Sequence, residues 1–165
     1  MTQDSAATIP DLASLLRGSG ARLVAFDGFM TSGKSTLAQQ LAETIGAALI
    51  SLDSFVDPTR AAPNYVGLLK IDQLSKHLTA SVARRMVILE GICMIDALDS
   101  LGVTADLMVY VKRISPTGLW QDGFHLEDYG ALGEECHFAR QSELDYHARR
   151  RPHEQPAVVY HRQEA

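Results

Sequence analysis

Short apolar segments alternate with segments of helical periodicity along this chain of 165 residues. The apolar segments are residues 22–27, 47–53, 86–90, 106–111 and 157–160. Apolar residues recur at helical spacing between and before them, in residues 10–18, 34–45, 71–84, 92–100 and 134–151. Strands that are apolar along their whole length need cover on both faces. The alternation therefore predicts an α/β fold in which helices cover both faces of a parallel sheet.

The length and composition favour one compact domain over residues 1–165, since domains cluster at roughly 100 to 150 residues. A net charge of −5 argues against nucleic acid as a partner, because binding to nucleic acid depends on a surplus of Lys and Arg. The sequence contains no signal-peptide pattern, and no apolar stretch long enough to span a membrane. Two cysteines without a Cys-x-x-Cys pair are typical of reduced thiols, so we expect a cytoplasmic protein without a membrane partner.

Residues 28–35 read Gly-Phe-Met-Thr-Ser-Gly-Lys-Ser, which matches a phosphate-binding loop (P-loop) between the first long apolar strand and a helix. Backbone amides of such a loop point at a phosphate, Lys34 can reach the β- and γ-phosphates, and Ser35 can ligate magnesium. The alternative is an ordinary Gly/Ser-rich turn. The residues predicted to bind the nucleotide here are Gly28, Met30, Thr31, Ser32, Gly33, Lys34, Ser35 and Thr36.

Two carboxylates follow neighbouring apolar strands. Asp53 ends the second strand and Glu90 ends the third. Ligands gather at the carboxyl ends of parallel strands, so both acids are expected beside the P-loop. Asp53 is predicted to accept the proton of an attacking hydroxyl, and Glu90 to hold magnesium together with Ser35, while Lys34 completes the catalytic set. A helix N-cap at Asp53 and a structural hydrogen bond at Glu90 remain the alternatives.

No Asn-Lys-x-Asp segment for guanine recognition is present, which disfavours a GTPase. Four segments, residues 27–36, 52–55, 88–92 and 146–160, together resemble the uridine kinase-like branch of the P-loop kinases, which includes phosphoribulokinase, pantothenate kinase and nicotinamide riboside kinase. The resemblance implies a three-layer fold around a five-stranded parallel sheet in the order 2-3-1-4-5. It also implies ATP and Mg²⁺ as cofactors, a substrate hydroxyl as acceptor, Asp53 as base, and lid arginines that close over the phosphates.

Two segments depart from this family's pattern. Residues 59–69 are shorter than the usual nucleoside-binding region, and residues 112–130, the expected lid or substrate loop, lack an arginine-rich helix. Arg113 and Arg149 are predicted to supply the lid charge, with Arg140 and the run 149–151 as further candidates. A solvated helix end is the alternative for the run.

Four residues are predicted to contact the acceptor: Asp53, Arg60, Tyr65 and Trp120. Simple loop packing is the alternative for Tyr65 and Trp120. The sequence thus predicts an ATP-dependent kinase of a small nucleoside-like substrate. A vitamin precursor or a sugar as acceptor, and a regulatory protein that binds ATP without consuming it, remain open. The oligomeric state, including a homodimer, also remains open.

Overall fold

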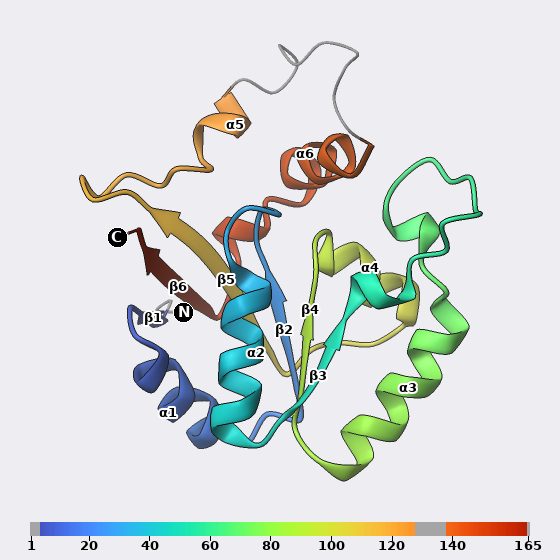
Figure 1. The fold of residues 1–165 in the computed structure, drawn as a ribbon, viewed down its shortest axis with the longest axis horizontal. Coiled ribbons are helices and arrows are strands. Elements are labelled where there is room, and N and C mark those ends of the chain that lie inside the picture. The colour runs from blue at the N-terminus through green and yellow to red at the C-terminus, as the bar shows by residue number, and fades with distance from the viewer. Residues whose placement is uncertain (1–3, 128–137, 165) are drawn as a thin grey trace.

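The computed structural model describes residues 4–127 and 138–164, and a parallel sheet of six strands forms the centre of this part of the chain (Figure 1). The strand order is β1-β6-β5-β2-β4-β3, and each neighbouring pair is parallel. The strands are β1 Asp4–Ala6, β2 Leu23–Asp27, β3 Ala48–Ser51, β4 Val87–Glu90, β5 Leu107–Ile114 and β6 Val158–Gln163.

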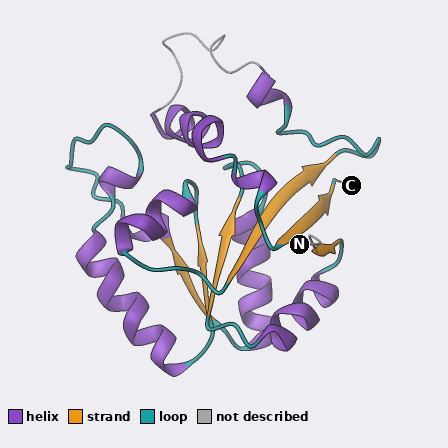
Figure 2. Ribbon diagram, turned by 180° about the vertical axis from the view of Figure 1, so that it is seen from behind, coloured by secondary structure: helices purple, strands orange, loops and turns teal. Residues whose placement is uncertain are grey.

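Helices cover both faces of this sheet (Figure 2). The helices are α1 Ile9–Ser19, α2 Lys34–Ile45, α3 Ile71–Arg84, α4 Met94–Leu101, α5 Phe124–Glu127 and α6 Phe138–Arg150. The apolar sides of α1 and α2 pack in one buried cluster, and those of α3 and α4 pack in a second cluster on the opposite face. The prediction of an α/β fold with a covered parallel sheet is therefore confirmed.

The central strand β2 explains why the sheet needs two layers of helices. All five of its residues are buried. Val24 and Phe26 belong to the cluster under α1 and α2, whereas Leu23 and Ala25 belong to the cluster under α3 and α4. Alternate side chains of a strand point to opposite faces, so a wholly apolar strand contributes to two cores.

The prediction of five strands is wrong, because the short strand β1 lies beside β6 and changes the full strand order. Apart from β1, the strands follow the order β3-β4-β2-β5-β6. The sequence of β1 is Asp-Ser-Ala, and only Ala6 is buried. An edge strand of three residues that are mostly polar carries no apolar run by which a sequence pattern could detect it.

The segment predicted as a lid also differs from expectation at its start. Strand β5 extends to Ile114 and pairs with β6 as far as Gln163, so residues 112–114 belong to the sheet. Residues 128–130 of the predicted lid, residues 134–137 of the predicted last helix, and Cys136 lie outside the described residues. Cys93 is a buried free thiol. None of the described helices is both long enough and apolar enough to traverse a lipid bilayer.

Candidate functional site

The segment between β2 and α2 has the backbone of an anion-binding loop. Gly33 precedes α2 with a φ of 83°, and the helix start has no side-chain cap. Gly28 and Gly33 both have a positive φ, and a Cβ on Gly28 would also lie 2.8 Å from the Val111 carbonyl oxygen. A residue with a side chain would be strained at either position. The first amides of α2 remain available to an anion, as in a phosphate loop.

Lys34 is the first residue of α2, and its side chain is almost fully buried against the loop. Its Nζ donates a hydrogen bond to the Phe29 carbonyl oxygen at 3.2 Å. The ammonium group therefore lies against the loop rather than in solvent. In this position it can contact a phosphate bound by the loop.

Ser35 and Glu90 are in direct contact. The Ser35 hydroxyl donates a hydrogen bond to Glu90 Oε2 at 2.8 Å. Strand β4 brings Glu90 to this position, because it pairs with β2 and sets Glu90 opposite Phe26. A hydroxyl and a carboxylate are hard oxygen ligands that suit Mg²⁺, which usually completes its shell with water and phosphate oxygens. The described residues contain no cluster of three His, Cys, Asp or Glu side chains that would hold a metal without such help.

Asp53 lies in the turn that follows β3. The register of β3 on β4 pairs Ser51 with Glu90, so Asp53 extends beyond the same edge of the sheet two residues later. Asp53 is exposed, and its Oδ1 accepts a hydrogen bond from the Tyr65 hydroxyl at 2.5 Å. The fold thus brings the P-loop, the Ser35–Glu90 pair and Asp53 to the carboxyl edge of the sheet.

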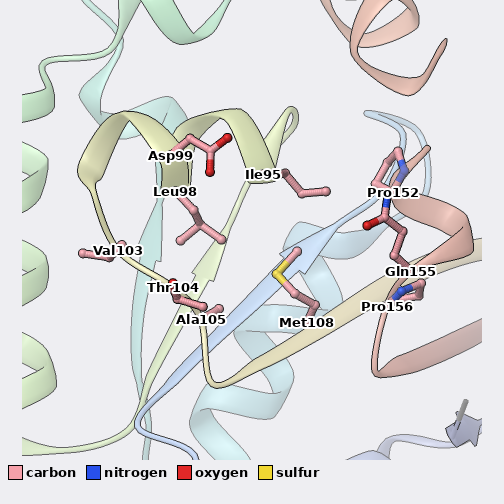
Figure 3. A pocket seen from close by; sticks show the side chains of 10 residues that line it. All are labelled: Ile95, Leu98, Asp99, Val103, Thr104, Ala105, Met108, Pro152, Gln155 and Pro156. Atoms are coloured by element: carbon pink, nitrogen blue, oxygen red, sulfur yellow. The ribbon is translucent and has the colours of Figure 1, made fainter. Parts of the chain in front are cut away.

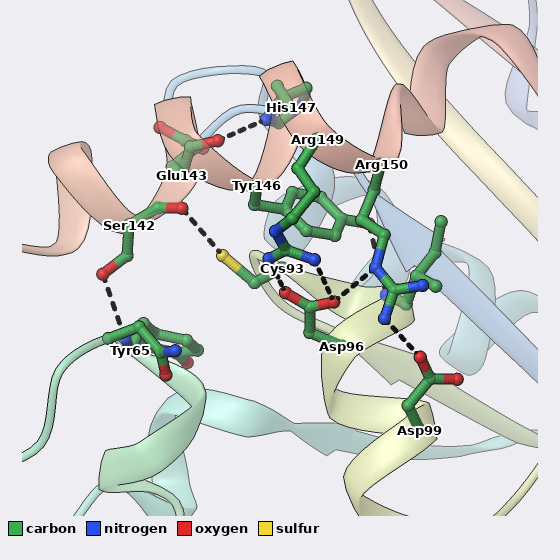
Figure 4. A network of polar contacts seen from close by, with 12 residues as sticks. Tyr65, Cys93, Asp96, Asp99, Ser142, Glu143, Tyr146, His147, Arg149 and Arg150 are labelled. Atoms are coloured by element: carbon green, nitrogen blue, oxygen red, sulfur yellow. Dashed lines mark hydrogen bonds and ion pairs between the residues drawn. The ribbon is translucent and has the colours of Figure 1, made fainter.

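The arginines predicted to supply lid charge lie in ion pairs. Arg149 donates to both carboxylate oxygens of Asp96 on α4, and it points to that helix in Figure 4. Arg113 contacts Asp122 at 3.2 Å and Glu164 at 3.6 Å. Asp122 also accepts a hydrogen bond from the Thr31 hydroxyl, so Arg113 is linked to the loop through that carboxylate.

Two other arginines approach the P-loop more directly. The Arg140 guanidinium lies 5.5 Å from the centre of the Phe29 ring. Arg162 donates to the Ser32 carbonyl oxygen at 3.3 Å. Arg162 follows the last apolar segment in a stretch of polar residues, where no local pattern distinguishes it.

Tyr65 and Arg60, both predicted to contact the acceptor, line different cavities in the described part of the chain. Tyr65 is nearly buried beside Asp53 and also lines a cavity of about 230 Å³ together with Cys93 and Ser142. Arg60 donates to the carbonyl oxygens of Gly67 and Leu69. It lines a different cavity, which does not include Asp53.

Trp120 packs within the molecule rather than facing an open acceptor site. Its ring centre lies 6.3 Å from that of Phe29 and 5.2 Å from that of His153, and the Lys112 ammonium lies 4.7 Å above it. These contacts connect the segment after β5 to the P-loop, so Trp120 anchors that segment.

Helix α6 supplies residues that the sequence did not identify as part of the site. The His147 ring stacks on Phe29, with 3.9 Å between ring centres and an angle of 10° between their planes. The Tyr146 hydroxyl donates to Asp27 Oδ2 at the end of β2. Burial raises the pKa of Asp27 to about 6, although this hydrogen bond and that from the Gly28 amide act in the opposite direction.

Polar side chains on α6 are buried where a charged helix would ordinarily expose them. Its buried residues are Ser142, Glu143, Leu144, Tyr146 and His147. The sequence signal that could have indicated this face is the recurrence of these residues at three- and four-residue spacing. Because most of these residues are polar, a search for apolar residues at helical spacing does not identify them as a buried face.

A further cavity of about 250 Å³ lies between α4, β5 and the turn Pro152–Glu154 (Figure 3). Its lining is largely apolar, with Ile95, Leu98 and Met108 among the contributing side chains. None of the residues predicted from the sequence to bind a nucleotide, metal or acceptor lines it. This cavity is therefore separate from the candidate site.

No family model matches the chain, and neither does any curated protein. Solved structures do match. A possible uridine kinase from Bacillus stearothermophilus aligns over 92% of this chain and 96% of its own, with a TM-score of 0.59 and 17% identity. A candidate fructose transport system kinase from Silicibacter sp. TM1040 aligns over 93% of this chain and 99% of its own, with a TM-score of 0.55 and 16% identity. This chain shares its fold with both of these structures.

The strand order accounts for the position of the site within the sheet. The strand that carries the loop, β2, is central and lies between β4 and β5. On one side of β2, Glu90 at the end of β4 contacts Ser35, and Asp53 follows β3 at the same edge of the sheet. Strands β5 and β6 lie on the other side of β2, and Arg113 and Arg162 are paired near their carboxyl ends.

Proposed function

We propose that this protein is an ATP-dependent phosphotransferase that moves the γ-phosphate of ATP to a hydroxyl group of a small nucleoside-like molecule. The observation that carries the proposal is the contact between Ser35 and Glu90 at the P-loop, with Asp53 at the same edge of the sheet. A phosphate loop alone serves many functions. A metal-ligating pair and an exposed carboxylate beside it are what phosphoryl transfer to a hydroxyl requires.

Each residue has a distinct part in this proposal. The amides of residues 28–36 and the Lys34 ammonium hold the phosphates of ATP. Ser35 and Glu90 hold Mg²⁺, which supplies charge neutralisation at the phosphate oxygens. Asp53 accepts the proton of the acceptor hydroxyl as the hydroxyl oxygen bonds to the γ-phosphorus. The bond between the γ-phosphorus and the bridging oxygen to the β-phosphate breaks, so that ADP leaves.

The acceptor is proposed to lie beside Asp53 and Tyr65, next to the cavity that Tyr65 lines. A nucleoside is favoured by the sequence resemblance to uridine kinase-like proteins and by the first structural match. A sugar is the second candidate, favoured by the structural match to a protein described as a candidate fructose transport system kinase. Both classes present a hydroxyl group to the same base.

The decisive experiment measures transfer of labelled phosphate from ATP to a panel of nucleosides, sugars and vitamin precursors, with Mg²⁺ present. We expect Lys34→Ala to abolish turnover and weaken ATP binding. Asp53→Asn should lower kcat by about 10² to 10⁴ while ATP affinity is retained, because only proton acceptance is removed. Asp72→Asn, a charge-matched change on the exposed side of α3, serves as the control and should behave as wild type.

Two results would contradict the proposal. Tight ATP binding with no acceptor-stimulated ADP release across the panel would indicate a regulatory nucleotide-binding protein. Equal loss of ATP binding in Lys34→Ala and Asp53→Asn would remove Asp53 from the role of base.

A further inference from the structure

The carboxylate of Glu143 accepts a hydrogen bond from a backbone amide of the P-loop. Glu143 lies on α6 and is fully buried. Its Oε1 accepts a hydrogen bond from the Met30 backbone N–H at 2.5 Å, across 113 positions of sequence. Its Oε2 accepts one from the Arg140 guanidinium at 3.2 Å. The same loop is the segment whose amides are proposed above to hold the phosphates of ATP.

The surroundings of Glu143 are those of an anion site. The positive groups that face it are Lys34, the Arg140 guanidinium on its own helix and the Met30 amide. Burial raises its pKa to about 7, while these groups act in the opposite direction. The His147 ring contacts the Glu143 main-chain carbonyl rather than the carboxylate. The protein's own carboxylate thus takes the kind of contact that a phosphate oxygen would take.

A triphosphate in the loop cannot leave this arrangement unchanged. One N–H group forms one strong hydrogen bond, so the Met30 amide cannot serve both Glu143 and a phosphate oxygen well. A carboxylate and a phosphate that approach the same N–H group also repel each other strongly in a site from which water is excluded. Binding of the nucleotide therefore requires Glu143 to move away or to take up a proton.

We propose that Glu143 is a built-in competitor of the triphosphate for the P-loop, and that nucleotide binding displaces its carboxylate from the Met30 amide. The proposal rests on the function proposed above. Displacement also releases Arg140 from its ion pair, next to the site that the phosphates enter. Helix α6 thereby regulates access to the loop. The hydrogen bond between Glu143 and the Met30 amide opposes phosphate binding, and the bound ligand breaks it.

The test compares ligand affinities of Glu143→Gln and wild type by calorimetry, with ATP, inorganic triphosphate and adenosine as probes. Glutamine keeps the shape of the side chain but removes its negative charge. We expect Glu143→Gln to bind ATP and inorganic triphosphate about tenfold more tightly, and to bind adenosine as wild type does, because adenosine carries no phosphate. Glu43→Gln makes the same substitution on the exposed side of α2 and should change none of the three affinities.

Lys34→Ala separates this proposal from the proposed function. If wild type binds ATP, Lys34→Ala does not, and Glu143→Gln shows no gain for either phosphate ligand, competition by Glu143 is overturned while the phosphate site stands. A gain for adenosine equal to that for ATP would also overturn it. If neither wild type nor Glu143→Gln binds ATP or triphosphate, both proposals fail.

A measurement on the unaltered protein covers the case in which Glu143→Gln does not fold. The side-chain carboxyl carbon of Glu143 can be followed by NMR as ATP is added. We expect its resonance to shift at saturation, and the Met30 amide proton to change partner in the same titration. A Glu143 carboxyl resonance that stays constant while the loop amides respond to ATP would overturn the proposal.

Discussion

The Tyr65 hydroxyl donates a hydrogen bond to Asp53 Oδ1 over 2.5 Å, and this contact fixes the orientation of the proposed base. Burial, together with the neighbouring Asp53 carboxylate, raises the pKa of Tyr65 above its usual value, so the hydroxyl stays protonated and remains a donor. The Tyr65 backbone is held in turn by the Ser142 hydroxyl of α6 at 3.0 Å. Asp53 is therefore positioned by a segment that is itself fixed to α6.

Removing this hydroxyl should impair catalysis more than binding. We expect Tyr65→Phe to lower kcat by about tenfold to a hundredfold and to leave the KM for ATP unchanged, because a misaligned base is costly while the phosphate loop is untouched. Steady-state kinetics with the best acceptor from the panel measure both constants. Unchanged kcat in Tyr65→Phe would mean that Asp53 is oriented by other contacts.

Replacing Glu90 should change the metal requirement. Glu90→Gln keeps a hydrogen-bond acceptor for Ser35 but removes the negative charge. We expect the Mg²⁺ concentration for half-maximal activity to rise about 10- to 100-fold, with activity partly restored at high Mg²⁺. Glu43→Gln on the exposed side of α2 is the matched control. A Mg²⁺ dependence that Glu90→Gln leaves unaltered would exclude Glu90 from the metal site.

The sheet and the P-loop were predictable because they depend on local patterns. Short apolar runs such as residues 22–27 and 86–90, separated by helical segments, are typical of buried parallel strands. The helix at residues 34–45 was also predictable, because its apolar periodicity begins at the loop and ends at Gly46. Strand β1 was not predictable, because its pairing with β6 is a tertiary contact between short polar segments.

The part of the site contributed by α6 could not be predicted for a related reason. Glu143 and His147 are polar residues in a charged helix, and their four-residue spacing alone does not distinguish a buried face from a solvent-facing one. Their burial depends on how α6 crosses the P-loop. The ion pair of Arg149 was not predictable for the same reason, because its partner, Asp96, lies on α4 and is brought near only by the fold.

The neutral state of His147 should make stability depend on pH. Its Nδ1 contacts the Glu143 carbonyl oxygen, which can only accept, so Nδ1 carries the proton and Nε2 accepts from the Tyr110 hydroxyl. Burial lowers the pKa of His147 to about 3, and the charges of His153 and Lys34 act in the same direction. Below the ordinary pKa of 6.5 the unfolded chain takes up a proton that the folded chain does not. Stability from this residue is thus complete above pH 6.5 and is lost as the pH falls towards 3.

A comparison of wild type with His147→Gln isolates this contribution, since Asp27 and Glu143 titrate in both proteins. We expect the stability advantage of wild type to shrink by about 2 kcal/mol between pH 7 and pH 5. Urea unfolding at the two pH values measures it. An advantage that stays constant or grows at pH 5 would mean that His147 is protonated in the folded protein.

Arg140 and Arg149 form a matched pair that tests which arginine serves the phosphates. Both lie on α6, but Arg140 is paired with Glu143 at the loop, whereas Arg149 is exposed and paired with Asp96. We expect Arg140→Ala to lower kcat by about a hundredfold, because a guanidinium released onto the phosphates stabilises the charge of the transferring group. Arg149→Ala should leave kcat unchanged and stability nearly so, since an exposed ion pair contributes little. Arg140→Lys keeps the charge but lacks the planar guanidinium, so its kcat should lie between those of wild type and Arg140→Ala. If instead Arg140→Ala keeps full kcat, the charge on the phosphates must come from the other side of the loop, where Arg162 contacts Ser32.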